Sequence, residues 1–323
     1  MTPSLGVVFH PAFPPETLPD YARRAEAAGL DELWFWEDCF YAGAFTSAAV
    51  ALGATRKIKV GIGILPAVAR NPLFAAMEIT TLARLYPGRF LPGFGHGVDL
   101  WMKQIGAYPK SPLKTLGETV EAVRRLLHGE KVTLHGNHVH LDEVQMRLVA
   151  EVVPPLFIGG IREKSLRLAG RHGDGAILTA LSSPAYVRWA GEQIRSGMEE
   201  SGRRQNQRVV FVLCQVDPEG LAARLSARGA IAAGVARGDP HLKSLGIAEQ
   251  AVEMVQTYGV EGAAARIPEA WVDELAAAGT PHQAAAMLKR LEDAGADSIV
   301  LQSITADPAD LDVYIHSLLP LLK

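Results

Sequence analysis

The sequence predicts an α/β fold, and specifically a (β/α)8 TIM barrel, from two observations. Short apolar runs rich in branched and aromatic residues alternate with longer amphipathic runs along the 323 residues, which is typical of strands joined by crossover helices. The segments AEAAGLDELWF, LAGRHGDGAIL and LEDAGADSIVL each place a glycine, an acidic residue and an apolar strand at a helix exit. Eight such units with right-handed crossovers can close into a barrel without edges, and an open doubly wound sheet is the alternative.

Eight strands follow from the apolar runs, with helices between them. We expect a single domain over residues 1–323, because α/β barrels commonly form one domain at this length. The predicted strands are Leu5–Phe9, Glu32–Trp36, Ile58–Leu65, Arg89–Phe94, Pro155–Ile158, Gly175–Leu178, Val209–Val216 and Ser298–Leu301.

Two stretches, residues 129–153 and 237–280, do not fit the repeat and are predicted to be insertions. The first contains VTLHGNHVHL, which predicts a hairpin around a Gly136-Asn137 turn. The second has a helical pattern over Ile247–Tyr258 and a looser part, IPEAWVDELAAAGTP. Insertions in barrels usually enlarge the loops where ligands bind, so this stretch is expected either near the barrel mouth or as a surface helix on the barrel wall.

Composition limits the classes of function. Hydrophobic residues make up 48%, charged residues 21%, and the net charge is −3, so no global field favours nucleic acid or an anionic membrane. Cys39 and Cys214 form no CxxC pair, which indicates neither a disulfide framework nor a cysteine zinc site. The sequence shows no export signal and no apolar stretch long enough to span a membrane. We therefore expect a cytoplasmic protein.

The best candidate anion site follows the fifth predicted strand, in PPLFIGGIREKSLRLAG. Gly159 and Gly160 permit close backbone approach, and the next helix presents free N–H groups and its positive dipole end. Arg162, Lys164 and Ser165 add charge and hydrogen bonds near the first turn. The segment is predicted to bind a phosphate, and a tight turn with solvent-facing cations is the alternative.

The fourth predicted strand ends in GFGHGVDLWM. Its GxGxG run lacks the spacing and the later acidic residue of a dinucleotide-binding motif. Glycine-rich backbone at a barrel mouth instead predicts room for a flat ring system, bordered by Gly97, His96 and Trp101. Ordinary packing is the alternative for Trp101.

Acidic and histidine side chains follow the first two strands. Glu37 and Asp38 lie where a barrel places catalytic groups, and because adjacent residues point differently, one is expected to face the pocket while the other caps a helix or pairs with a cation. His10 ends the first strand, where it is placed either to protonate a substrate or to make a structural hydrogen bond.

A metal site is not expected. His135, His138 and His140 are close in sequence, and strand alternation would place His138 and His140 on one face, but no carboxylate or cysteine set completes a coordination sphere. GxSxG, HExxH and Walker A sequences are missing, which disfavours common hydrolases and nucleotidases.

Several segments together closely resemble the luciferase-like family, in particular its deazaflavin-dependent branch, which is similar to methylenetetrahydromethanopterin reductases. The resemblance covers about residues 4–180, and a weaker match lies near the end of the sequence. It is carried by GLDELWFWED, VGIGILPAVARNPLFAAMEITTLARLYPGRF, GFGHGVDLWMKQIGA, SPLKTLGETVEAVRRLLHGE, PPLFIGGIREKSLRLAGRHGDGAIL and AGTPHQAAAMLKRLEDAGADSIVL.

The resemblance implies a barrel that holds coenzyme F420 or FMN across its mouth, with the phosphate near Gly159 and Gly160. It also implies a bulge, often with a non-prolyl cis peptide, beneath the central ring, and Gly63-Ile64 matches this position best. The family's strand-two Asp-His pair is matched by Asp38, but Cys39 stands in place of the histidine. His10 or His96 is then a candidate replacement.

We expect an oxidoreductase that transfers a hydride between coenzyme F420 and a small organic molecule. An FMN-dependent monooxygenase of the same fold is the alternative. A protein that binds a flavin or phosphate ligand without turnover, and an aldolase-like or isomerase-like barrel acting on a phosphorylated sugar, belong to other classes. The resemblance also implies a homodimer, with neither nucleic acid nor a membrane as a partner.

Overall fold

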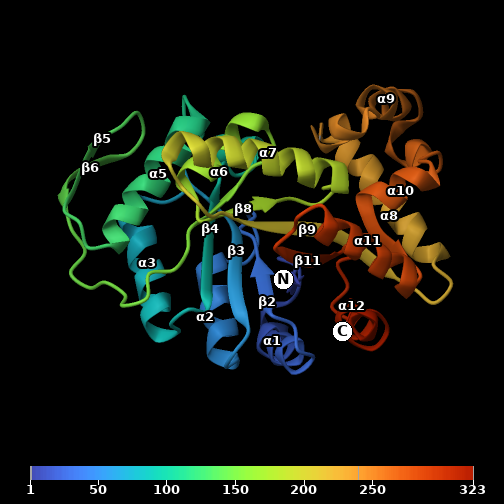
Figure 1. The fold of residues 1–323 in the computed structure, drawn as a ribbon, viewed down its shortest axis with the longest axis horizontal. Helices are drawn as coiled ribbons and strands as arrows, with labels where there is room; N and C mark the ends of the chain where they lie inside the picture. Colours follow the sequence, from blue (N-terminus) through green and yellow to red (C-terminus); the bar gives the residue numbers. More distant parts are fainter. Residues whose placement is uncertain (1, 239, 323) are drawn as a thin grey trace. The chain divides into compact units, whose positions relative to one another are not determined.

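The computed structural model describes residues 2–238 and 240–322 (Figure 1). The chain divides into two compact units. The central unit comprises Pro14–Ile177 and Gln193–Gln207, and the terminal unit comprises Met1–Phe13, Leu178–Glu192 and Arg208–Lys323. Each unit has its own parallel strands and covering helices.

In the central unit, parallel strands pair in the order β2-β3-β4-β7-β8. Strands β3 and β4 lie side by side in Figure 1. The strands are β2 (Glu32–Phe35), β3 (Lys59–Pro66), β4 (Phe90–Gly95), β7 (Phe157–Gly159) and β8 (Gly175–Leu178). The helices are α1 (Leu18–Ala27), α2 (Ala44–Ala54), α3 (Pro72–Leu85), α4 (Asp99–Gln104), α5 (Pro112–Leu127) and α6 (Glu163–His172). Helix α7 (Pro184–Ser201) contributes residues to both units, because the division falls between Glu192 and Gln193.

The core of the central unit is built on its strands. Every residue of β2 and β4 is buried, as expected for parallel strands covered on both faces. The fully buried Trp34 ring meets Phe157 edge-on at 5.9 Å between centroids and occupies the space that a side chain at Gly61 would need. Its Nε1–H donates to the buried Glu32 carboxylate at 2.7 Å. The bulky ring is thus accommodated without leaving its one polar group unpaired.

The predicted hairpin is present as β5 (Val132–His135) and β6 (His140–Val144), but its connection is wider than predicted. Four residues, 136–139, form the loop, because the Glu118 carboxylate accepts backbone N–H groups from Asn137, His138 and Val139. His138 is therefore a loop residue, and the prediction that it shares a strand face with His140 is wrong. No group of three or more histidine, cysteine or acidic side chains in the described ranges is placed to hold a metal ion.

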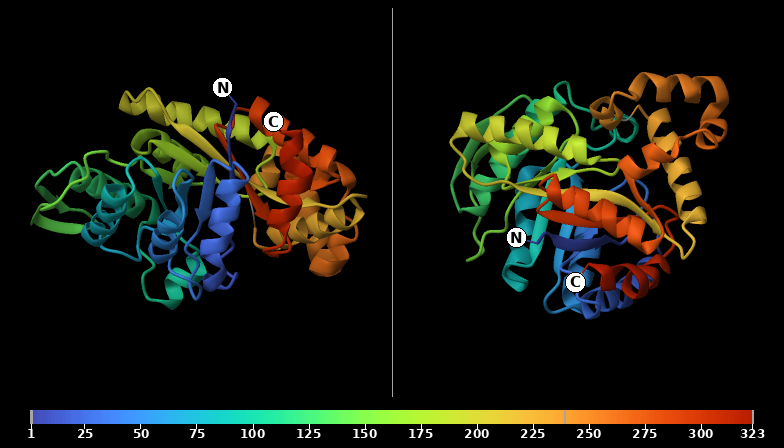
Figure 2. Two further views of the ribbon diagram at one scale, coloured as in Figure 1. Left: turned by 90° about the horizontal axis from the view of Figure 1, so that it is seen from below. Right: turned by 45° about the vertical axis from the view of Figure 1, so that its right-hand side comes forward.

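In the terminal unit, parallel strands pair in the order β10-β9-β11-β1. Figure 2 shows α9 packed at one end of α8 in this unit. The strands are β1 (Ser4–Val8), β9 (Gln207–Val216), β10 (Ala276–Gly279) and β11 (Ser298–Ser303), and the helices are α8 (Leu221–Ala236), α9 (Ala248–Ala264), α10 (Glu269–Leu275), α11 (Pro281–Asp293) and α12 (Asp310–Val313).

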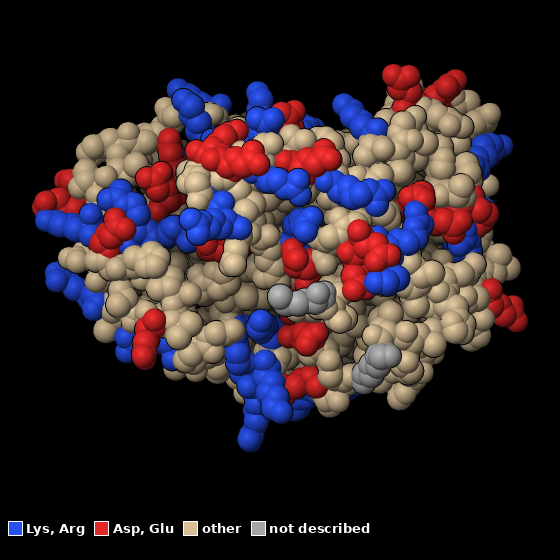
Figure 3. Space-filling view, in the orientation of Figure 1, with Lys and Arg blue, Asp and Glu red and all other residues tan. Residues whose placement is uncertain are grey.

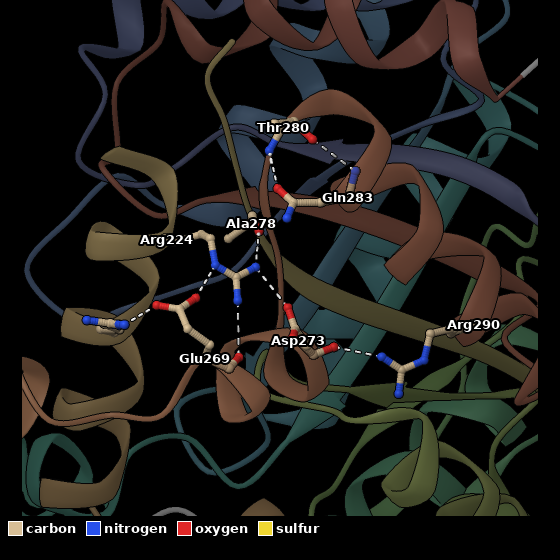
Figure 4. Close-up of polar contacts among 8 residues, drawn as sticks. Arg224, Glu269, Asp273, Ala278, Thr280, Gln283 and Arg290 are labelled. Atoms are coloured by element: carbon tan, nitrogen blue, oxygen red, sulfur yellow. Dashed lines mark hydrogen bonds and ion pairs between the residues drawn. The ribbon is translucent and has the colours of Figure 1, made fainter. Parts of the chain in front are cut away.

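The stretch that looked loose in sequence is ordered in the structure. Helix α10 and the unpredicted strand β10 occupy it, and Ala276 of β10 is in register with Leu213 of β9. Figure 4 shows how Arg224 of α8 joins these elements. Its guanidinium binds the Glu269 carboxylate, lies 2.8 Å from Asp273 Oδ1 and donates to the Ala278 carbonyl of β10. One cation therefore orders a short strand whose alanine-rich sequence carries little β-propensity.

Basic and acidic side chains are interspersed on the face shown in Figure 3, as the small net charge leads one to expect. None of the helices in the described ranges combines the length and apolar character needed to cross a membrane.

Replacing Arg224 with methionine is expected to lower the free energy of unfolding by about 1–2 kcal/mol, because it leaves the Asp273 carboxylate and the β10 carbonyl without their partner. Urea denaturation measures the change. Arg204→Met in the loop before β9, where the arginine is exposed, is the control and should have little effect. Equal midpoints for the two variants would show that the Arg224 network does not stabilise this unit.

Candidate active site

A bulge interrupts the pairing of β3 with β4. The register shifts between Ile62 and Leu65, and the Gly63-Ile64 peptide is cis. Both backbone features are present at the position that the resemblance implied. The Ile64 carbonyl accepts the Glu37 N–H at 3.2 Å, so the bulge is tied to the exit of β2. Its role beneath a cofactor ring stays a prediction.

The packing of the Ile64 side chain explains why two neighbouring positions are occupied by glycine. A Cβ at Gly95 would lie 2.7 Å from Ile64 Cγ1, and one at Gly159 would lie 2.6 Å from Ile64 Cγ2. A Cβ at Gly93 would lie 2.6 Å from the Ile62 carbonyl oxygen. The Cβ positions of Gly93 and Gly95 are therefore filled by the protein's own atoms, and room for a flat ring along this run stays a prediction.

Helix α6 begins after Gly160 with Arg162 as its N-cap residue. The Gly160 N–H donates to the Ile177 carbonyl at 3.3 Å, so it is already paired within the protein. The N–H groups of the first helical turn have no intrahelical acceptor, and the exposed Arg162 and Lys164 lie beside them. Because the Glu163 carboxylate lies 3.3 Å from Arg167 Nε, the start of α6 retains a positive local field.

His96 and Ser165 are brought together from different elements. His96 Nε2 lies 3.0 Å from Ser165 Oγ, which connects the exit of β4 to the first turn of α6. His96 Nδ1 is buried and has no hydrogen-bond partner in the part of the chain that the structure describes. Burial lowers the pKa of His96, so its imidazole is neutral at pH 7.

Gly97 and Trp101 follow on the same segment. Gly97 has a φ of 73°, and a Cβ there would lie 3.1 Å from both Met102 Sδ and Pro66 Cβ. Helix α4 is thereby packed closely against the end of β3. The half-buried Trp101 meets the Phe40 ring edge-on, with centroids 6.3 Å apart. The loop after β2 and helix α4 thus contact each other.

Glu37 forms the structural contacts that were expected of one strand-two carboxylate. It binds the Arg70 guanidinium, with Arg70 Nη2 2.7 Å from Glu37 Oε1, and accepts the Ala44 N–H at the start of α2 at 3.2 Å. Arg70 Nε also lies 3.5 Å from Glu78 Oε2. Our sequence interpretation missed Arg70, although an Arg-Asn-Pro sequence before a helix places a cation at a strand exit.

Asp38 has a different environment. Its carboxylate accepts the Trp36 Nε1–H at 2.9 Å, while burial raises the pKa of Asp38. The pKa of the neighbouring Cys39 is also raised, by burial and by the negative charges of Asp38 and Glu37. Cys39 is therefore a neutral thiol at pH 7, and burial favours the protonated form of the Asp38 carboxyl group.

His10 belongs to the terminal unit. Its Nδ1 accepts the Ala12 N–H at 3.1 Å, its ring lies 5.8 Å from that of Phe13, and burial lowers its pKa. The structural hydrogen bond that was the alternative for this histidine is thus present.

A cavity of about 250 Å³ lies where the loop after β3 faces the hairpin tip. Arg70 lines one side, and His138 and His140 line the other. The insertion therefore reaches a loop at the carboxyl edge of the strands, which sequence spacing did not indicate.

Known proteins share sequence and fold with this chain. Residues 3–298 match the family described as luciferase-like monooxygenase. The chain is 27% identical over 312 residues to 5,10-methylenetetrahydromethanopterin reductase of Methanolobus tindarius, covering 93% of this chain and 94% of that protein. It is 32% identical over 208 residues to an F420-dependent glucose-6-phosphate dehydrogenase of Nakamurella multipartita, covering 60% and 61%.

Solved structures define the fold. The coenzyme F420-dependent tetrahydromethanopterin reductase of Methanopyrus kandleri superposes with a TM-score of 0.84 at 22% identity, covering all of both chains. A diketocamphane monooxygenase component of Pseudomonas putida, solved with FMN, has a TM-score of 0.72 at 18% identity, covering 99% of this chain and 98% of that one. The predicted (β/α)8 barrel is confirmed, and its eight predicted strands correspond to β1, β2, β3, β4, β7, β8, β9 and β11.

Replacing Trp36 with phenylalanine is expected to raise the pKa of Asp38 further. The indole hydrogen bond lowers that pKa by stabilising the carboxylate, whereas burial, which raises it, stays in place. Carbon-13 NMR titration of the aspartate carboxyl groups measures the shift, and Trp189→Phe in α7 is the control. A lower or unchanged value in Trp36→Phe would refute this account of the Asp38 environment.

Proposed function

Because the chain belongs to the luciferase-like monooxygenase family of oxidoreductases, we propose that it transfers a hydride between coenzyme F420 and a small organic substrate. The observation that supports the proposal most directly is the bulge at Gly63-Ile64. The Ile64 side chain packs against Gly159, the last residue before the turn into α6. A support for a ring and a site for a phosphate are thus built on one packed contact.

The residues of the central unit fit a cofactor that has a flat ring system and a phosphate. The phosphate would be held at the start of α6 by first-turn N–H groups, by Arg162 and Lys164, and by the hydroxyl of Ser165. The ring would lie against Gly63 and Ile64, with Gly97, His96 and Trp101 as further contacts. Gly159 and Gly160 would serve by allowing close packing of Ile64 and Ser165.

When bound, a reduced deazaflavin supplies a hydride, and the acceptor takes up one proton to complete a two-electron reduction. We propose that Asp38 holds this proton, because it follows Glu37, whose N–H donates to the Ile64 carbonyl of the bulge, and because burial raises its pKa. Neutral His96 would orient a polar atom of the acceptor. Glu37 acts as a positioning residue through Arg70 and α2. His10 stays a predicted further donor.

An FMN-dependent monooxygenase is the second candidate. The FMN-bound relative supports it, because it shares the barrel at a TM-score of 0.72. Among the relatives named above, the two that match this chain by sequence are a methylenetetrahydromethanopterin reductase and an F420-dependent dehydrogenase. This balance favours F420 in our proposal.

Fluorescence titration of the purified protein with coenzyme F420 and, separately, with FMN is the primary test. We expect saturation by F420 in the micromolar range, about −8 kcal/mol in binding free energy, and much weaker binding of FMN. A preference for FMN would favour the monooxygenase. If F420 binds but no donor or acceptor changes its redox state, the protein is a carrier and the proposed reaction is wrong.

Reversing the charge at the start of α6 should weaken cofactor binding without unfolding the protein. Because both side chains are exposed, the double variant Arg162→Glu/Lys164→Glu is expected to raise the Kd for F420 by about tenfold or more, most strongly at low salt. Arg204→Glu controls for the change in net charge. Equal Kd values in the two proteins would remove α6 as the phosphate site.

A further inference from the structure

Two short segments beside the proposed site expose large apolar side chains. One follows β2 and the other contains α4, which follows β4. Phe40 is 73% exposed and Leu100 is 61% exposed, although large apolar side chains in such positions lose favourable burial. We define the apolar rim as Phe40, Tyr41, Val98, Leu100, Trp101 and Ile105.

The apolar rim is physically joined to the bulge. On the β2 side, Glu37 donates its N–H to the Ile64 carbonyl three residues before Phe40. On the β4 side, Met102 of α4 packs against Gly97. The Phe40 and Trp101 rings then contact each other across the two segments. Parallel strands β2, β3 and β4 place all of these exits at one edge of the sheet.

Charge is scarce in these segments. Residues 39–43 contain no charged side chain, and residues 98–105 contain only Asp99 and Lys103. Both are engaged by Tyr108: Lys103 Nζ lies 4.8 Å from the centre of its ring, and its hydroxyl donates to Asp99 Oδ2 at 3.4 Å. A phosphorylated substrate would find no unengaged cation on the apolar rim.

We propose that the apolar rim recognises an uncharged substrate with an aromatic ring or alkyl chain next to its hydride-accepting double bond. The inference rests on the proposed function for the reaction, but the recognition itself is a binding property of the chain. Phe40 and Trp101 would contact the apolar part of the substrate, and Asp38, two residues before Phe40, lies on the same loop.

Isothermal titration with 2-acetonaphthone, an uncharged aromatic ketone, tests the proposal in the full chain with and without F420. We expect Phe40→Ser and Leu100→Ser each to weaken binding by about fivefold or more. Leu148→Ser is the matched control, because Leu148 is 62% exposed and lies after the hairpin, and its Kd should stay within about twofold of the parent.

Equal affinity in all four proteins, or no binding in either state, would overturn the proposal. Glucose 6-phosphate binding that is lost in the same two variants would also overturn it. If sedimentation velocity shows that Leu100→Ser dissociates a dimer while ketone binding is unchanged, the surface is a contact between copies and the proposal is wrong. Ketone binding that depends on the apolar rim in a protein that does not bind F420 would uphold the recognition and refute the proposed function.

Discussion

The packing of one isoleucine determines how the parts of the candidate site are arranged. Ile64 leaves the strand register at the bulge, and its side chain then fills the space next to Gly95 and Gly159. A close-packed interior has no room for an added methyl group at either glycine without displacement of neighbouring atoms. The exits of β3, β4 and β7 are therefore held at a fixed separation. This separation also determines where the residues that follow these strands begin.

Electrostatic contacts at the same strand exits give the polar groups different environments. Arg70 fixes Glu37 against the start of α2, which leaves Asp38 as the carboxyl group in an environment that favours its protonated form. Across the sheet edge, the exposed Arg162 and Lys164 supply the cations near the start of α6. The proposed proton carrier and the proposed anion site thus belong to separate elements, the loop after β2 and helix α6.

The barrel strands were predictable because each one is a short apolar run, and several of them follow a helix exit with glycine, as at Gly29 and Gly295. Strand β10 was not, since AAAG carries no strand signal and is held by Arg224 from an element more than fifty residues away. The sequence indicated that one strand-two carboxylate would pair with a cation or cap a helix, and Glu37 does so. It did not identify Arg70 as the cation, because contacts between strand exits depend on three-dimensional packing. The atoms that pack against Gly93 and Gly95 were not predictable for a related reason: a glycine indicates close approach, but the sequence does not reveal which atoms approach.

The hairpin illustrates how a barrel can acquire new parts. Its loop is held to α5 by a single carboxylate, Glu118, which gathers three successive backbone amides. Backbone amides are supplied by almost any sequence, so the residues between β5 and β6 are free to diverge while the attachment persists. Since this loop borders the cavity beside Arg70, evolution can alter one wall of that cavity by substitutions in the insertion, without disturbing the strands of the barrel.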